Sequence, residues 1–266
     1  MNMSRLTRRT AALALLATAL PALAQQQAPR VGVVLLHGVA ARSSSMAYLA
    51  DHLRKAGHLV ANLDLPWSKE EEFNLPLAEA ERRVAAGLDS LRRQGAQKLV
   101  VAGFSLGGLF AAHMAARTRV DALVTIAPNG GADQKRLGDE VARARAVIAA
   151  GKGEEKTLLH NAGVVGHERY PMPASVPSAY VTWFDPQGAF NFERIFRSQR
   201  AGVPVLLVAP TRDLENFLKV KDAVFKGLPA HPGNRLYEPE TDHLGAINAS
   251  AQEVVRWITE VVQNGR

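Results

Sequence analysis

The most informative segment of the sequence is Gly103-Phe104-Ser105-Leu106-Gly107-Gly108. An apolar, Val-rich run precedes it directly, and an alanine-rich helical pattern follows it directly. A G-x-S-x-G turn between a strand and a helix needs glycines around the serine, because side chains there would collide with the neighbouring strand and helix. Such a turn exposes the serine hydroxyl at the carboxyl edge of a sheet. We therefore predict that Ser105 is a catalytic nucleophile, and that Gly103 and Gly107 support its turn.

A serine nucleophile requires a base, and the base is a histidine that a carboxylate holds in one tautomer. In proteins whose nucleophile lies in such a strand-to-helix turn, the three catalytic residues follow one another along the chain in the order serine, acid, histidine. His243 follows the last expected strand and precedes the last expected helix, so its loop lies on the same sheet edge as Ser105. The alternatives are His160 and His167, which lie in an irregular segment, and His231, at the wrong end of the last strand. We predict that His243 is the base.

Asp213 is the expected acid. It stands four residues beyond an apolar strand that ends at Ala209, and it therefore emerges at the same edge as the other two residues. Asp242 is adjacent to His243 in sequence, but adjacent residues rarely point at each other well enough to share the ring nitrogen. The remaining alternatives are Asp133, Asp185 and Glu215.

Donors for a developing oxyanion are expected at the end of the first strand, in Leu35-Leu36-His37-Gly38-Val39. The backbone N–H groups of Val39 and Leu106 would converge on one oxygen beside Ser105, and each such donor is usually worth about 2.7 to 4 kcal/mol. Gly38 supports this loop. His37 is expected to prop the loop rather than to take protons, and the alternative is a strand-end histidine satisfied by backbone groups.

Composition bounds the class of protein. The chain has 266 residues, of which 47% are hydrophobic and 21% charged, and it contains no cysteine. These values are typical of a globular domain. The lack of cysteine excludes disulfides, thiolate metal sites and cysteine nucleophiles. No metal, nicotinamide or flavin motif is visible, so we expect no cofactor.

The first 24 residues have the pattern of a secretory signal peptide. Arg5, Arg8 and Arg9 precede the apolar stretch Ala11 to Leu20, and Ala22-Leu23-Ala24 forms a small-x-small cleavage site. The apolar stretch is shorter than the roughly 20 residues of a membrane-spanning helix. We expect cleavage after Ala24 and export of the mature protein, which is either periplasmic or secreted. We expect no membrane-spanning segment in the mature protein. The arginine pair leaves twin-arginine export as an alternative route.

Charge argues against a nucleic-acid partner. Signal cleavage lowers the formal net charge from +7 to +4, because it removes three arginines and no acidic residue. The remaining basic residues occur as scattered helix pairs such as Arg82-Arg83 and Arg92-Arg93, with acidic residues between them. A nucleic-acid interface would gather them on one stripe together with aromatic residues. The expected partner is a small-molecule substrate, and the sequence leaves the oligomeric state open.

Short apolar runs alternate with longer amphipathic stretches, which indicates an α/β fold with a mostly parallel sheet and helices on both faces. The expected strands are residues 31–36, 59–63, 98–102, 122–127, 203–209 and 235–238. The expected helices are at about residues 44–56, 76–94, 106–117, 214–227 and 246–262.

An insertion of about 129–200 interrupts this alternation. It opens with an expected helix at 132–150, and within it Tyr180 to Phe196 holds six of the 16 aromatic residues of the chain. Insertions of this length between core strands are usually functional caps or lids. We expect at least one of Trp183, Phe184 and Phe190 to line a substrate pocket facing Ser105. The alternative is that these rings form the core of the insertion.

The chain resembles the α/β-hydrolase superfamily over about residues 31–262. The resemblance rests on four segments in matching order and spacing: the His-Gly loop at 37–38, the serine turn, the acid loop and the histidine loop. The resemblance implies a single domain at 25–266 with a core of about six strands, the first two family strands being missing. Two stretches depart from the family or add little to it. Asp64-Leu65-Pro66-Trp67 replaces the frequent Asp-x-Pro-Gly turn, and Trp183-Phe184-Asp185-Pro186 resembles small bacterial hydrolases without indicating a substrate.

The resemblance leaves several reactions open. Serine at position 105 argues against the related dehalogenases, which use aspartate, and against dienelactone hydrolases, which use cysteine. We expect ester hydrolysis through an acyl-serine intermediate. The alternatives are a thioesterase, an amidase or peptidase of the same fold, and a non-catalytic periplasmic binding protein that kept the hydrolase shape.

Overall fold

A computed structural model describes residues 28–129, 134–159, 163–165, 168–170, 174–188 and 190–265. The predicted signal peptide, 1–24, lies outside the described residues. So do three of the alternative site residues, Asp133, His160 and His167.

The centre of the molecule is a six-stranded sheet in the order β2-β1-β3-β4-β7-β8, and every pair of neighbouring strands in it is parallel. The prediction of a six-stranded α/β sheet is confirmed. The strands are β1 (Val31–Leu36), β2 (Leu59–Leu63), β3 (Lys98–Phe104), β4 (Ala122–Ile126), β7 (Val205–Val208) and β8 (Arg235–Tyr237).

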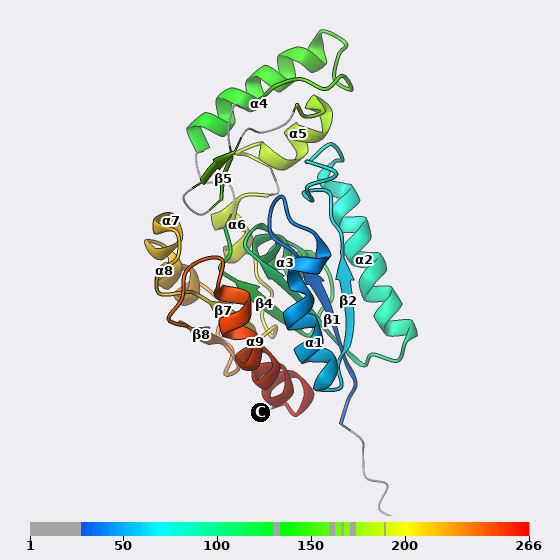
Figure 1. Ribbon diagram of the computed structural model, residues 1–266, viewed down its shortest axis with the longest axis vertical. Coiled ribbons are helices and arrows are strands. Elements are labelled where there is room, and N and C mark those ends of the chain that lie inside the picture. Colours follow the sequence, from blue (N-terminus) through cyan, green and yellow to red (C-terminus); the bar gives the residue numbers. More distant parts are fainter. Residues whose placement is uncertain are drawn as a thin grey trace, which may run out of the picture.

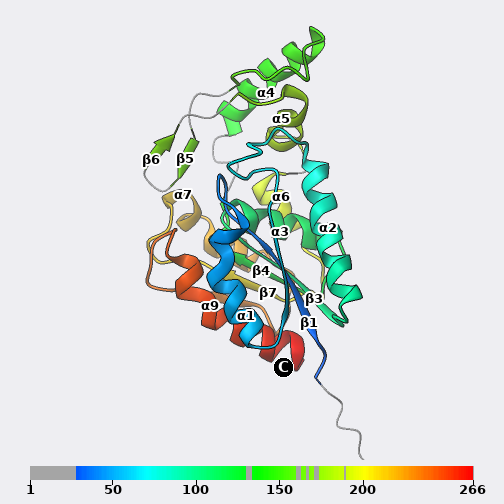
Figure 2. The same ribbon diagram turned by 45° about the vertical axis from the view of Figure 1, so that its right-hand side comes forward.

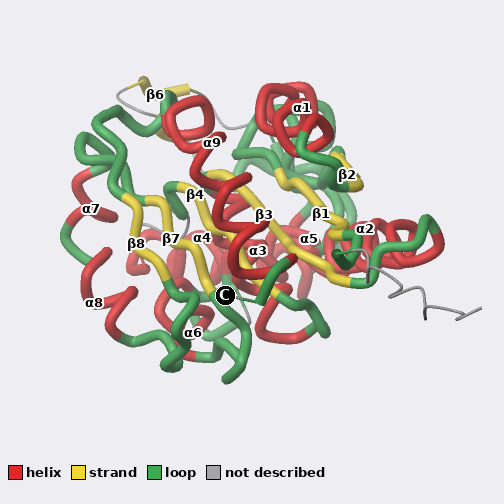
Figure 3. Tube along the Cα trace, turned by 90° about the horizontal axis from the view of Figure 1, so that it is seen from below, coloured by secondary structure: helices red, strands yellow, loops and turns green. Residues whose placement is uncertain are grey.

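Helices cover both faces of this sheet (Figures 1 and 3). Alternate residues of a strand point to opposite faces, and β1 shows the result. Val33 and Leu35 pack with the face covered by α1 (Ala47–Lys55) and α9 (Ala246–Trp257). The intervening strand residues pack with the face covered by α2 (Leu77–Arg93) and α3 (Leu106–Arg117). The fully buried strands therefore read as continuous apolar runs.

The segment between β4 and β7 contains α4 (Gln134–Ala149), the antiparallel strands β5 (Gly163–Val165) and β6 (Glu168–Tyr170), α5 (Pro177–Phe184) and α6 (Phe192–Arg197). Figures 1 and 2 show α4 and α5 beyond the edge at which the parallel strands end. This is the edge that carries Ser105. In contrast, α6 packs against α3 beside the sheet, with Ile195 and Phe196 in the main core.

The remaining elements are short. A 3-10 turn, η1 (Ser43–Met46), precedes α1, and the chain after α9 continues as a π-helical turn, η2 (Ile258–Gln263). The prediction of one helix over 214–227 is wrong, because the chain forms α7 (Glu215–Leu218) and α8 (Lys221–Lys226). Val220, which lies between them, is the N-cap of α8 with φ of −116° and ψ of −12°. Among the described residues, no helix combines the length and apolarity needed to cross a membrane.

Candidate active site

Ser105 lies in the turn between β3 and α3 with φ 55° and ψ −121°. A non-glycine residue rarely adopts positive φ, and such strain is typical of functional sites. The neighbouring glycines allow this tight turn. A Cβ on Gly103 would overlap the carbonyl of Gly107, and a Cβ on Gly107 would overlap the carbonyls of Leu36 and His37. Close backbone packing therefore explains why both positions are glycine.

Backbone hydrogen bonds from the end of β4 hold the strained serine. The N–H of Ser105 donates to the carbonyl of Ile126 over 2.9 Å, and the N–H of Asn129 donates to the carbonyl of Ser105 over 3.2 Å. Ser105 is thus fixed on both sides by the segment 126–129, so that its hydroxyl has a defined position at the sheet edge.

The structure brings Ser105, His243 and Asp213 together although they are far apart in sequence. Nε2 of His243 lies 3.0 Å from Oγ of Ser105, and Nδ1 of His243 lies 2.6 Å from Oδ1 of Asp213. All three residues are buried, with exposed fractions of 6 to 8%. Because an ionised carboxylate only accepts hydrogen bonds, Nδ1 carries the proton and donates it to Asp213. Nε2 is then free to accept a proton from the serine hydroxyl.

The alternative carboxylates have other partners. Oδ1 of Asp242 accepts a hydrogen bond of 2.8 Å from the N–H of Gly245, which stabilises the turn that carries His243. Asp185 pairs with Arg145 over 2.5 Å, and Glu215 pairs with Lys219 over 2.7 Å. Of the described candidates, Asp213 is the one that contacts the imidazole.

The loop after β1 lies against the serine. A Cβ on Gly38 would stand 3.1 Å from the ring of Phe104 and 3.5 Å from Cβ of Ser105, so only a small residue lets this loop approach. The next residue is Val39, one of the two expected oxyanion donors. The other, Leu106, is the first residue of α3, where backbone N–H groups have no partner within the helix.

His37 is fully buried and links this loop to the loop after β2. Its Nδ1–H donates to the carbonyl of Gly38 over 2.7 Å, and the N–H of Leu65 donates to Nε2 over 3.2 Å. Its carbonyl accepts a hydrogen bond of 2.9 Å from the indole of Trp67. Burial lowers the pKa of His37 below its ordinary value of 6.5. Both ring nitrogens of His37 are thus engaged by backbone groups. This geometry fits the predicted propping role and also the alternative of a strand-end histidine satisfied by backbone groups.

The aromatic residues of the insertion pack on one another and on the core. Trp183 is 1% exposed, its ring forms edge contacts with Trp67 and Phe73, and its N–H donates to the carbonyl of Leu75 over 2.7 Å. Phe190 packs in the same core against Phe110. For Trp183 and Phe190 this packing agrees with the alternative prediction, in which the rings form the core of the insertion.

Phe184 differs from its neighbours because it is half-buried, between Phe73 and Tyr180. A substrate-lining role for any of the three rings stays a prediction.

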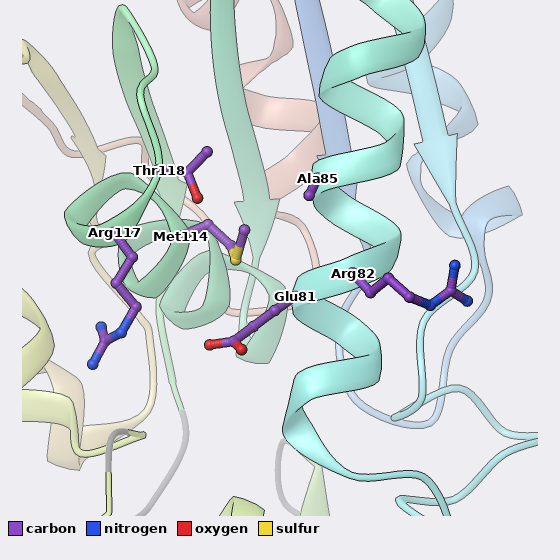
Figure 4. Close-up of a pocket in the computed structure, with 6 residues that line it drawn as sticks. All are labelled: Glu81, Arg82, Ala85, Met114, Arg117 and Thr118. Carbon is purple, nitrogen blue, oxygen red and sulfur yellow. The ribbon is translucent and has the colours of Figure 1, made fainter.

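A separate pocket of about 340 Å³ lies between α2 and α3 (Figure 4). Its lining residues are Glu81, Arg82, Ala85, Met114, Arg117 and Thr118. Met114 follows Leu106 by eight residues, which corresponds to about 12 Å along a helix. This pocket is therefore not part of the site around Ser105. Within the described ranges, no group of three or more His, Asp or Glu side chains is arranged to hold a metal ion.

Comparison with known proteins identifies the family. The family model of the alpha/beta hydrolase family matches residues 33–257, and the chain belongs to this family. A search of curated proteins finds no match.

Solved structures with a similar fold include three enzymes or enzyme complexes. A thermostable carboxyl esterase from Bacillus coagulans has TM-score 0.63 and 14% identity, with 90% of this chain and 91% of that chain covered. Est1E from Butyrivibrio proteoclasticus, solved with ferulic acid, has TM-score 0.60 and 15% identity, with 90% and 91% covered. A monoacylglycerol lipase from Paleococcus ferrophilus has TM-score 0.57 and 19% identity, with 86% and 94% covered. At these identities the likeness shows the shared fold.

Proposed function

We propose that the protein is a serine hydrolase that cleaves an ester through an acyl-serine intermediate, with Ser105, His243 and Asp213 as its catalytic triad. The observation that carries this proposal is the pair of contacts at His243, 3.0 Å to the serine hydroxyl and 2.6 Å to the buried carboxylate. The first distance is typical of a nucleophile hydrogen-bonded to its general base, and the second is typical of a base hydrogen-bonded to the acid that orients it.

The reaction uses these groups in sequence. Oγ of Ser105 attacks the ester carbonyl carbon while Nε2 of His243 takes the hydroxyl proton. The carbonyl oxygen becomes an oxyanion, and the N–H groups of Val39 and Leu106 stabilise it. When the C–O bond to the leaving group breaks, His243 returns the proton to the departing alkoxide. Water then attacks the acyl carbon while the same nitrogen takes its proton. The bond between the acyl carbon and Oγ breaks, which releases the acid, and the proton passes from Nε2 to Oγ of Ser105.

Asp213 has a supporting role in each step. Its carboxylate keeps the proton on Nδ1 and stabilises the imidazolium that forms when Nε2 accepts a proton. His37 cannot replace His243 as the base, because Nε2 of His37 already accepts the Leu65 N–H.

Esters are favoured as substrates because the structural neighbours include a carboxyl esterase and a monoacylglycerol lipase. Thioester and amide hydrolysis use the same acyl-serine chemistry and are the alternatives. A binding protein without catalysis would have no physical need for a connected serine, imidazole and carboxylate.

A fluorophosphonate probe tests this proposal directly, since it labels only an activated serine. We expect labelling of the wild type and none of Ser105→Ala. A graded series of p-nitrophenyl esters, with thioester and peptide substrates beside it, then identifies the bond that is cleaved. A wild-type protein that is neither labelled nor active on any of these substrates would exclude the serine hydrolase function.

We also propose that the protein is exported, on the strength of the signal-peptide pattern at 1–24. Expression with the native leader should give a periplasmic or secreted product whose N-terminal residue is Gln25. An uncleaved product that stays in the cytoplasm would contradict export.

A further inference from the structure

The carboxylate of Asp213 is held through only one of its oxygens. Oδ1 accepts hydrogen bonds of 2.6 Å from both Nδ1–H of His243 and the N–H of Leu214. Oδ2 is buried and has no hydrogen-bond donor among the residues that the structure describes. A carboxylate bound on one side can pivot about that oxygen. The position of Asp213 must therefore be set by the loop that carries it.

On one side, this acid loop is tied to the histidine loop by backbone hydrogen bonds. The N–H of Thr211 donates to the carbonyl of Pro239, and the N–H of Arg212 donates to the carbonyl of Thr241, each over 3.0 Å. These bonds continue the pairing of β7 and β8 beyond the strands. They fix the acid relative to the base, but they do not fix it relative to the nucleophile.

On the other side, a pair of asparagine side chains connects the acid loop to the nucleophile. Asn216 belongs to α7, three residues after Asp213, and its Nδ2–H donates to Oδ1 of Asn129 over 3.3 Å. Asn129 in turn donates its backbone N–H to the carbonyl of Ser105 over 3.2 Å. A path from the acid loop to the serine thus exists outside the triad itself.

The side-chain amide of Asn129 makes fewer hydrogen bonds than a purely structural role would favour. Its Nδ2 is buried, and across the described ranges no acceptor lies within hydrogen-bond distance of it. A buried donor without a partner costs free energy, and an apolar residue of similar shape would avoid that cost. Stability of the fold alone therefore does not favour asparagine at this position.

We propose that Asn129 and Asn216 form a positioning pair that sets the distance between the acid loop and the nucleophile turn. This inference rests on the proposed function, because it assigns the pair a role in aligning Asp213 and His243 with Ser105. Neither asparagine touches the reacting atoms in this role. The pair acts on the rate of the chemical step rather than on substrate binding.

The test compares Asn216→Ala, Asn129→Leu and the double variant with the wild type, on one p-nitrophenyl ester that the wild type hydrolyses. Because misplacement of catalytic groups by about 1 Å can cost 100-fold, we expect each single variant to lower kcat by about 10- to 100-fold, with KM within about twofold. The double variant should be no slower than the slower single variant, since both remove the same contact. The melting temperature of Asn129→Leu should equal or exceed that of the wild type.

Two substitutions serve as matched controls. Lys219→Ala removes another exposed side chain from the end of α7, and Asn62→Leu removes an asparagine whose side chain donates to the carbonyl of Ser43, two strands away from Ser105. Both should keep the wild-type kcat.

Specific outcomes would overturn the positioning pair. One is an unchanged kcat in Asn216→Ala, which changes an exposed residue and does not threaten folding. A second is a double variant whose kcat falls by the product of the two single losses. A third is a loss of kcat that follows the loss of melting temperature across the variants. If the wild type hydrolyses no ester and takes no fluorophosphonate label, the proposed function itself has failed, which is a distinguishable result.

Discussion

The N–H of Leu65 donates a hydrogen bond of 3.2 Å to Nε2 of His37, and this bond joins the loop after β2 to the loop after β1. The second ring nitrogen of His37 donates to the carbonyl of Gly38 over 2.7 Å. Both bonds require a neutral imidazole with the proton on Nδ1. Protonation of Nε2 would replace the acceptor by a donor facing the N–H of Leu65, and the loop that carries Val39 would lose its support.

The pH dependence of stability should reflect this arrangement. Burial lowers the pKa of His37, and it also lowers the pKa of His58, which is 4% exposed. Below the ordinary histidine value of 6.5 the unfolded chain binds protons that the folded chain does not bind. The stability that these neutral histidines contribute is therefore complete above pH 6.5 and is lost as the pH falls below it.

Urea unfolding between pH 8 and pH 5 measures this effect. Each histidine contributes a slope of at most about 1.4 kcal/mol per pH unit to the free energy of unfolding. Carboxylates such as Glu79, whose pKa the Arg82 and Arg83 guanidinium groups lower to about 2, titrate below this window. The variant His58→Leu should reduce the slope, and a wild-type stability that does not change over the range would contradict the prediction.

Removal of the nucleophile or the base should abolish ester turnover without unfolding the protein. Because the triad acts as a unit, Ser105→Ala and His243→Ala should each lower kcat by about 10³- to 10⁶-fold, and the double variant should be scarcely worse than either. Ser105→Ala removes one hydroxyl and keeps the Cβ, so the cost of the positive φ at this position should not change and the melting temperature should change little. Full residual activity in Ser105→Ala would refute the mechanism.

The acid is tested by substitutions that keep shape. Asp213→Asn should lower kcat by about 10⁴-fold with little effect on KM, because an amide can hold the imidazole in the wrong tautomer. Asp242→Asn is the matched control, since Asp242 contacts Gly245 and not the imidazole. Should Asp242→Asn or Asp185→Asn be inactive while Asp213→Asn remains active, the assignment of the acid is wrong.

The sheet could be predicted because its signals are local. β1 and β2 have the predicted bounds. The continuous apolar run of β1 marks a buried parallel strand, whereas β2 lies at the sheet edge, is half-buried and contains Asn62. The site residues could be selected because parallel strands bring their carboxyl ends to one edge. Asp213 and Asp242 both follow strands that end at this edge. The choice between them rests on local geometry, because adjacent residues rarely point at each other well enough to share the ring nitrogen.

Other features had no signal in the sequence. Asn129 and Asn216 are 87 residues apart, and their contact depends on the exact path of two loops. β5 and β6 have three residues each, too few for a periodic pattern. No glycine or proline marks the break between α7 and α8. In the insertion, the aromatic density fits either a pocket or a core. The packing of Trp183 and Phe190 in the core favours the second interpretation for these two rings, and it depends on contacts that no local pattern encodes.

The glycines of the serine turn should tolerate no side chain. In Gly103→Ala the new Cβ would overlap the backbone of Gly107, which cannot move without displacing α3. We expect a loss of several kcal/mol in the free energy of unfolding, or no folded product.

Gly138→Ala is the matched control for this prediction. It lies within α4, where the nearest atom to a new Cβ is 3.8 Å away. Alanine there should stabilise the protein by about 0.5 to 1 kcal/mol. A Gly103→Ala variant as stable as the wild type would show that the turn is looser than this geometry requires.

The ring of Trp183, in α5, contacts Phe110 in α3, Phe190 in the insertion, and Trp67 and Phe73 in the segment after β2. Because the side chain is 1% exposed, Trp183→Ala leaves a large cavity and should cost about 3 to 5 kcal/mol in the free energy of unfolding. Trp183→Phe should cost less, since a ring still fills part of the space, and Tyr48→Ala, at an exposed position, should cost little. Activity on esters of different acyl length should fall uniformly with stability. A Trp183→Ala variant that keeps its stability but changes its preference between acetate and long acyl esters would instead show that this ring lines the substrate pocket.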